Sequence, residues 1–209
     1  MTRPSDTRLL VLHGLRLKGF AGADDVSEVT SLTLADVECH LDQLQVAELV
    51  IYRDGRLTGW ALTAAGRIEH ERLLAKGLEA LGCRPVVEDA YGRFLDLNPA
   101  LLTVCTAWQM KDETTLNAHD DEDYDRGVVD QLGDIHDHVA PVLADLRNAL
   151  DRYHGYQPRF ENALVRVQNG DHDWFAKPMI DSYHTVWFQL HEDLLNTLGI
   201  ERSKEAARS

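Results

Sequence analysis

Residues 33–67, TLADVECHLDQLQVAELVIYRDGRLTGWALTAAGR, decide the fold of the N-terminal part of this 209-residue chain. Thr33 is of a type that caps helices, because its hydroxyl can accept a hydrogen bond from a backbone N–H of the first turn. Apolar residues then recur at intervals of four and three positions, which places their side chains on one face of a helix. We therefore predict a helix over residues 34–47, with a buried face made of Val37, Leu41 and Leu44.

Two short runs of β-prone residues follow this helix. They cover residues 49–52 and 57–62, and the pair Asp54-Gly55 between them is a common hairpin turn. Three helices, two strands and a fourth helix make up a winged-helix module, in which the hairpin is the wing. The other helices of the module are predicted at residues 8–18 and 25–30 and, after a cap at Thr63, from Ala64 onward.

The pattern of residues 33–67 resembles that of a known family. Its sequence L-x-x-L…ELV…DGRLTGW-x-LT-x-x-GR is similar to the winged-helix modules of MarR-type bacterial regulators. A second, weaker similarity of the ending GW-x-LT-x-x-GR is to winged-helix modules associated with phosphoenolpyruvate-utilising enzymes. The first resemblance implies a DNA-binding protein that regulates transcription, and it places the helix and the wing without assigning individual functional residues.

The remainder of the chain is predicted to be helical, so that the whole protein is mainly α. Residues 82–85, Gly-Cys-Arg-Pro, have the composition of a linker. We therefore predict a winged-helix domain over residues 1–84 and an all-α ligand-binding or dimerisation domain over residues 85–209. The second domain is expected to be an antiparallel helical bundle. Its helices are predicted at about residues 86–96, 99–110, 122–152, 158–169 and 175–198.

The net charge of −14 is unevenly distributed along the chain. Residues 1–84 contain 10 Lys and Arg against 12 Asp and Glu, whereas residues 85–209 contain 11 against 23. Nucleic acids bind basic surfaces, because cationic side chains displace the counterions of the phosphates. The second domain is therefore unsuited to nucleic acid, and the N-terminal module alone is a candidate for binding DNA.

The helix at residues 34–47, which would read DNA in a winged helix, has an acidic outer face. Its outward residues include three carboxylates and no cation, and carboxylates repel the phosphates that line a groove. The candidate DNA-binding residues are Gln43 on this helix, Arg53 and Arg56 beside the wing turn, and Arg67 after the wing. The acidic face also favours an alternative, in which the winged helix is a protein-interaction or regulatory module of a metabolic enzyme system and binds no DNA.

Seven of the ten histidines lie in the segment from residue 119 to residue 191. On the helix predicted at 175–198, His184 and His191 fall within the apolar stripe. Because burying an imidazole without a polar partner costs free energy, each of them is expected to contact a polar group, a ligand or a metal. We predict a site for a small ligand or for a divalent metal such as zinc. Its candidate residues are His119, Asp121, Asp125, His136, His184 and His191, and Trp108 and Trp187 would form its walls. The alternative is that His184 and His191 are core histidines hydrogen-bonded to Asp125 or to hydroxyl groups, with no ligand.

Other features narrow the class of protein. Three widely spaced cysteines without a C-x-x-C pair argue against a disulfide framework and fit a reducing cytoplasm. We find no secretory signal, no apolar stretch that could span a bilayer, and no motif of nucleotide-binding or hydrolytic enzymes. The sequence therefore predicts a cytoplasmic transcriptional regulator, and a metal-dependent enzyme built on the second domain is a further alternative for which no motif argues. We expect a homodimer that binds double-stranded DNA through the wing and responds to a metal or a small-molecule effector.

Overall fold

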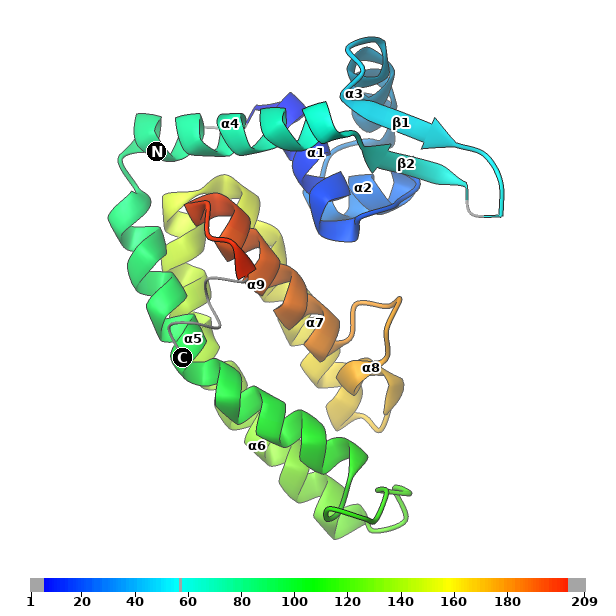
Figure 1. The fold of residues 1–209 in the computed structure, drawn as a ribbon. Coiled ribbons are helices and arrows are strands. Elements are labelled where there is room, and N and C mark those ends of the chain that lie inside the picture. The colour runs from blue at the N-terminus through cyan, green and yellow to red at the C-terminus, as the bar shows by residue number, and fades with distance from the viewer. Residues whose placement is uncertain (1–5, 57, 203–209) are drawn as a thin grey trace. The chain divides into compact units, whose positions relative to one another are not determined.

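The structure of the chain, a computed structural model, describes residues 6–56 and 58–202. It is mainly helical, with 73% helix and a two-stranded antiparallel sheet (Figure 1). The chain divides into two compact units, which we call the sheet unit and the helical unit. The described part of the sheet unit comprises residues 6–85, 150–155 and 192–202, and the helical unit comprises residues 86–149 and 156–191.

The sheet unit begins with the elements in the order predicted from the sequence. They are α1 (Thr7–Lys18), α2 (Ala23–Thr30), α3 (Leu34–Val46), β1 (Val50–Arg53), β2 (Gly59–Leu62) and α4 (Ala64–Leu81). Leu57, at which the second strand is predicted to begin, lies outside the described residues. Two later segments join these elements, namely the 3-10 helix η1 (Asp151–Gly155) and the C-terminal half of α9 (Tyr183–Leu198). The sheet unit is therefore discontinuous in sequence.

Thr63 and Gly66 explain why the sequence LT-x-x-G joins the hairpin to α4. The Thr63 hydroxyl oxygen accepts a hydrogen bond from the Gly66 N–H at 3.0 Å, which caps α4, and the same hydroxyl donates to the Glu48 carbonyl at 2.8 Å. A Cβ at position 66 would lie 1.9 Å from the carbonyl oxygen of Leu49. Glycine is therefore required for α4 to begin this close to the first strand.

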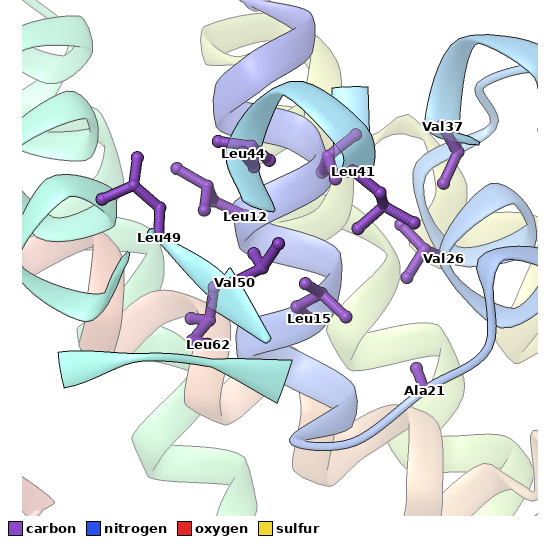
Figure 2. Close-up of a cluster of buried hydrophobic side chains, with 11 residues drawn as sticks. Leu12, Leu15, Ala21, Val26, Val37, Leu41, Leu44, Leu49, Val50 and Leu62 are labelled. Carbon is purple, nitrogen blue, oxygen red and sulfur yellow. The ribbon is translucent and has the colours of Figure 1, made fainter. Parts of the chain in front are cut away.

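A continuous apolar core holds the sheet unit together (Figure 2). The three residues predicted for the buried face of α3, Val37, Leu41 and Leu44, are at most 2% exposed. Burying each such side chain contributes roughly 1.5–3 kcal/mol, which matters because an isolated helix of this length is marginal in water. The other members of the core are Val11, Leu12, Leu15, Ala21, Val26, Leu49, Val50 and Leu62.

The helical unit contains four further helices and the N-terminal half of α9. The four are α5 (Arg84–Gln109), α6 (Glu122–Ala149), α7 (Tyr156–Gln168) and α8 (Asp173–Ala176), and the first two residues of α5 belong to the sheet unit. No helix in the described part of the chain is both long enough and apolar enough to cross a membrane.

The predicted break between residues 96 and 99 is wrong, because α5 continues through Pro99. A proline inside a helix lacks a donor for the hydrogen-bond ladder and crowds the preceding turn. Here Phe94 and Leu101, on either side of it, are 0% and 1% exposed. Their packing outweighs the local cost of the proline.

The single helix predicted over residues 175–198 is interrupted. It is replaced by α8, which ends at Ala176, and by α9, which starts at Tyr183. Proline disfavours helical backbone in the residue before it, and Lys177, which precedes Pro178, is extended with ψ of 128°. The break therefore has a local cause that the apolar periodicity of this segment hid.

Candidate functional site

Three side chains of metal-binding type converge at the N-terminal end of α6 in the helical unit. His119 lies in the loop before α6, Asp125 lies in its first turn, and His172 lies immediately before α8. Each offers one nitrogen or oxygen atom, and these three atoms lie within 4.8 Å of one another. Ligands of one transition-metal ion are separated by roughly 3–4 Å when each bond is about 2.1 Å long. Small side-chain movements would therefore suffice to close the cluster around an ion.

Asn117 holds this cluster together. Its side-chain amide donates to the Asp125 carboxylate at 2.7 Å and to the Trp108 carbonyl at 3.1 Å, and its side-chain oxygen accepts from the His119 N–H at 3.1 Å. His119 has a φ of 55°, in the left-handed region that costs free energy for most residues. The hydrogen bonds of Asn117 fix the loop in this conformation and direct the His119 ring to α6.

The Asp125 carboxylate is held in its charged form. Burial raises the pKa of Asp125, but the hydrogen bonds from Asn117 and His119 outweigh this effect, so the net pKa is lower than usual. The His119 Nδ1 atom lies 2.9 Å from the carboxylate. A carboxylate that is ionised at neutral pH is the form that binds metal ions.

Aromatic rings form one side of the cluster. Trp108 stacks on Phe175 with ring centroids 4.3 Å apart, and its centroid lies 4.4 Å from that of His119 and 5.2 Å from that of His172. The cluster opens on a cavity of about 630 Å³, whose lining includes Trp108 and all three ligand-type residues. Trp108, which was predicted to form a wall of the site, therefore lies beside His119 and lines this cavity. The cavity gives solvent and ions access to the cluster.

The other predicted histidines lie away from this cluster. His136 has its Nδ1 atom 3.4 Å from the Tyr183 hydroxyl, and burial lowers its pKa. His184 is half-buried, and burial lowers its pKa as well. His191 packs against the ring of Phe94 with centroids 5.4 Å apart. These three residues are therefore not part of the group of ligand-type side chains that the described residues bring together.

Asp121 and Trp187 also have other roles than those predicted for them. The Asp121 carboxylate accepts a hydrogen bond from the Tyr124 N–H at 3.1 Å and so caps the start of α6. Trp187 stacks on Phe94 at 4.5 Å and donates from Nε1 to the Asn98 side chain at 3.1 Å. Trp187 therefore supports the interior of the helical unit rather than the His119 cluster.

Sequence reasoning missed His172 and Asn117. His172 lies between α7 and α8, in a segment without periodicity, and 47 positions separate it from Asp125. The dipeptide Asn169-Gly170 marks a turn there, and Gly170 has a φ of 86°. The sequence therefore indicates a turn at this position, but it does not show which other segment the turn contacts, and so it does not place His172 beside Asp125.

The predicted DNA-binding residues are exposed. Gln43 is on α3 and donates to Cys39 Sγ at 3.3 Å, Arg53 ends β1, Arg56 is in the connection between the strands, and Arg67 is on α4. The three carboxylates of α3, Asp36, Glu38 and Asp42, are exposed as well. Positive charge is therefore concentrated at the hairpin, and negative charge on α3.

An acidic hollow lies between α3 and the sheet. It has a volume of about 450 Å³, and its lining includes the carboxylates of Glu38 and Asp42 and the rings of Tyr52 and Trp60. The two rings are 5.0 Å apart between centroids. Carboxylates beside aromatic rings form a surface that attracts cationic side chains.

Two imidazoles and one carboxylate are a donor set suited to Zn²⁺, Fe²⁺ or Mn²⁺. In the His119 cluster this set adjoins an open cavity and is held by a hydrogen-bonded amide. The metal-binding interpretation therefore rests on the geometry of this cluster. No protein-family model, curated protein or solved structure matches this chain.

Proposed function

We propose that the protein is a metal-responsive transcriptional regulator. In this proposal the helical unit binds a divalent transition-metal ion through His119, Asp125 and His172, and the sheet unit is a MarR-like winged helix that binds duplex DNA. The convergence of the three ligand atoms within 4.8 Å carries the proposal. We further propose that the regulator is a homodimer. Light scattering tests this, because it measures the mass of the particle in solution.

The order of elements in the sheet unit supports the winged-helix part of the proposal. Three helices precede a two-stranded hairpin, α4 follows it, and the register pairs Val50 with Leu62 and Arg53 with Gly59. This register places Arg53 at the turn end of the hairpin, close in sequence to Arg56. Two cations at the tip of a wing can contact phosphates without reading bases.

The surroundings of the His119 cluster support the metal-binding part. Three protein ligands leave at least one coordination position of a zinc-type ion for water, and the adjoining cavity supplies access for it. Asn117 would act on the ion indirectly, because it donates to the Asp125 carboxylate that would bind it. The negative charge of the unit also favours a cation.

Metal titration of the full-length protein tests this proposal. After chelator treatment, isothermal titration with Zn²⁺ should reveal one site per chain, and His172→Ala should weaken binding by about 100-fold or more, since it removes one ligand. His138→Ala is the matched control, because His138 is an exposed histidine of α6 that lies outside the cluster. Equal Zn²⁺ affinities of wild type and His172→Ala would contradict the proposal.

The DNA-binding part is tested by fluorescence anisotropy with a labelled duplex at several salt concentrations. If the wing contacts phosphates, Arg53→Ala and Arg56→Ala should each weaken binding uniformly across sequences. Each should also reduce the slope of log affinity against log salt by about 1. If the slope of log affinity against log salt is unchanged in both variants, the wing does not contact the DNA phosphates.

The acidic hollow favours a second candidate function, in which the sheet unit binds a basic segment of a protein partner. Glu38 and Asp42 would pair with a Lys or Arg side chain that lies against Trp60. The double variant Glu38→Gln, Asp42→Asn separates the two candidates. It should leave DNA affinity equal or higher if the protein binds DNA, and it should abolish co-purification of a basic partner if the hollow is a protein-binding site.

A further inference from the structure

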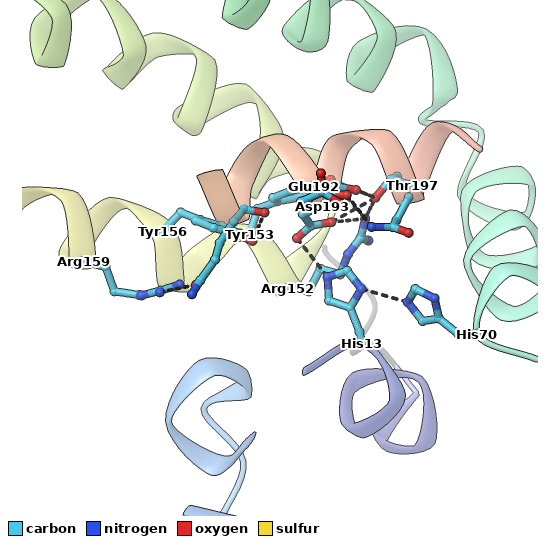
Figure 3. A network of polar contacts seen from close by, with 11 residues as sticks. His13, His70, Arg152, Tyr153, Tyr156, Arg159, Glu192, Asp193 and Thr197 are labelled. Carbon is cyan, nitrogen blue, oxygen red and sulfur yellow. Dashed lines mark hydrogen bonds and ion pairs between the residues drawn. The ribbon is translucent and has the colours of Figure 1, made fainter. Parts of the chain in front are cut away.

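The sheet unit contains a buried polar network that the proposed function does not use (Figure 3). At its centre is Asp193 of α9, which is 1% exposed. The carboxylate of Asp193 lies 2.9 Å from His13 Nε2, 3.0 Å from Thr197 Oγ1 and 3.3 Å from Arg152 Nη2. Arg152 belongs to η1, and its guanidinium group lies over the ring of Tyr153 at 4.6 Å. The charge of Asp193 is therefore compensated inside the unit.

The network continues from Asp193 through two histidines. His13 of α1 has its Nδ1 atom 3.0 Å from Nε2 of His70, which lies on α4 and is 0% exposed. Because Asp193 accepts a hydrogen bond, His13 Nε2 must carry the hydrogen, and in the neutral pair His70 Nε2–H then donates to His13 Nδ1. His70 Nδ1 has no hydrogen-bond partner among the described residues. The chain of contacts thus links α9 to α1 and α4.

Two members of this network also line a cavity of about 230 Å³ in the sheet unit. Arg152 and Thr197 contribute its buried polar groups, since their side chains are 5% and 3% exposed. Asp6 and Lys76 are exposed residues of the same lining. The walls are apolar and consist of Leu9, Leu73, Leu74, Leu78, Ala80, Leu81 and Leu150. The cavity therefore combines apolar walls with a buried cation.

Gly77 in α4 keeps this cavity wide. It lines the cavity, and a Cβ built on it would meet nothing within 4 Å. Glycine in the interior of a helix costs about 1 kcal/mol relative to alanine. No close approach of another group requires a glycine at this position, in contrast to Gly66. The absence of a side chain at position 77 leaves room for another molecule.

We propose that this cavity binds a small apolar molecule that carries a carbonyl group. Its apolar body would contact the leucines of α4, and its carbonyl oxygen would accept a hydrogen bond from Arg152, because a guanidinium group only donates. The ligand would contact Arg152 and Thr197, which contact Asp193 and through it His13 and His70. Binding would thereby reach α1 and α4, the helices that flank the predicted DNA-reading elements. This site is separate from the His119 cluster and goes beyond the proposed function.

Acetophenone is a suitable probe, and isopropylbenzene is its matched control, since it has a similar shape but lacks the carbonyl. The dissociation constants are measured by NMR titration of the full-length protein in the presence of chelator. Acetophenone should bind at least about tenfold more tightly than isopropylbenzene. The chelator keeps this result independent of metal binding. Equal affinities for the two probes, or binding of neither, would overturn the proposal.

Two glycine variants locate the site. Gly77→Leu should fill the cavity and weaken acetophenone binding by at least about tenfold, while circular dichroism confirms that the helices are retained. Gly92→Leu is the control, because Gly92 also lies inside a helix, has open space at its Cβ and does not line this cavity. It should bind acetophenone as the wild type does. Unchanged binding by Gly77→Leu would exclude the cavity as the site.

The histidine network provides an independent measurement. In the wild type, acetophenone should shift the imidazole resonances of His13 and His70, and those of His119 and His172 should stay in place. If the resonances of the helical unit move while those of His13 and His70 do not, the probe binds elsewhere and the proposal is wrong.

Discussion

Each unit of this protein contains a cluster made of two histidines and one aspartate, and the two clusters differ in almost every other respect. In the sheet unit, Asp193, His13 and His70 are at most 4% exposed and are joined end to end. In the helical unit, the ligand atoms of His119, Asp125 and His172 converge on one point, and His172 is exposed. The same residue types therefore occur once as a buried chain and once as an open triangle.

The difference shows what decides the chemistry of such residues. A guanidinium nitrogen of Arg152 lies 3.3 Å from the Asp193 carboxylate, so a second cation there would be repelled. The Asp125 carboxylate instead receives hydrogen bonds from a neutral amide and from His119. Burial and the neighbouring cation make the first cluster a structural link, whereas access and convergence make the second a candidate metal site.

The largest expected effect is on stability, and it separates the two aspartates. Asp193→Asn removes the buried charge that compensates Arg152, so the free energy of unfolding should fall by about 3–5 kcal/mol. Asp125→Asn keeps the shape and one acceptor oxygen, and it should cost only about 1 kcal/mol. Urea denaturation of both variants and the wild type measures the difference. Equal losses would mean that the two clusters are not distinguished by burial.

A pH-dependent loss of stability comes next, and it is specific to the buried cluster. Burial, with a smaller contribution from His13, lowers the pKa of His70 from 6.5 to about 3. The unfolded chain therefore binds a proton below pH 6.5 that the folded protein does not bind until about pH 3. This contribution to stability is fully present above pH 6.5 and decreases as the pH falls, by about 2 kcal/mol at pH 5.

His70→Gln isolates this effect, because glutamine can still donate a hydrogen bond but does not titrate in this range. Urea denaturation between pH 7.5 and pH 5 should give a shallower dependence for His70→Gln than for the wild type. His138→Gln, at an exposed position, should keep the slope of the wild type. If the free energy of unfolding depends on pH in the same way in all three proteins, the lowered pKa assigned to His70 is contradicted.

The third prediction concerns the open cluster and depends on the proposed metal site. Asn117→Ala removes the hydrogen bonds that hold the Asp125 carboxylate and the His119 loop, and it should lower Zn²⁺ affinity by about 10- to 100-fold. Asn169→Ala, in an exposed position among the residues that line the same cavity, is the control and should leave the affinity unchanged. Isothermal titration measures both, and an Asn117→Ala affinity equal to that of the wild type would exclude the indirect role of Asn117.

The parts of the structure that the sequence predicted are those encoded by near neighbours. The cap at Thr63, the periodicity of α3 and the hairpin runs all act over a few residues, and each appears at or near the predicted position. His119 and Asp125 were both predicted as site residues, and they lie six positions apart. Such features are predictable because their physical causes are local.

The missed parts are contacts between distant segments. The hydrogen bond between His13 and His70 joins positions 57 residues apart, and periodicity cannot show which helix faces meet. The continuation of α5 through Pro99 depends on the packing of Phe94 and Leu101, which is also nonlocal. His136, His184 and His191 were grouped with His119 from their helical faces alone, and the fold places them elsewhere.

The smallest predicted effect is at an ion pair beside the open cluster, and the matching substitution at Arg152 of the buried cluster provides the comparison. Arg126 and Asp123, at the open cluster, form a surface pair at 2.7 Å with side chains 65% and 90% exposed. Water screens this pair, so Arg126→Ala should change the free energy of unfolding by less than about 0.5 kcal/mol. The same truncation at Arg152 leaves the buried Asp193 charge without its guanidinium partner, and should cost several times more, about 3–5 kcal/mol. If urea denaturation gives similar losses for the two variants, solvent reaches the buried network, and the contrast between a closed and an open cluster must be abandoned.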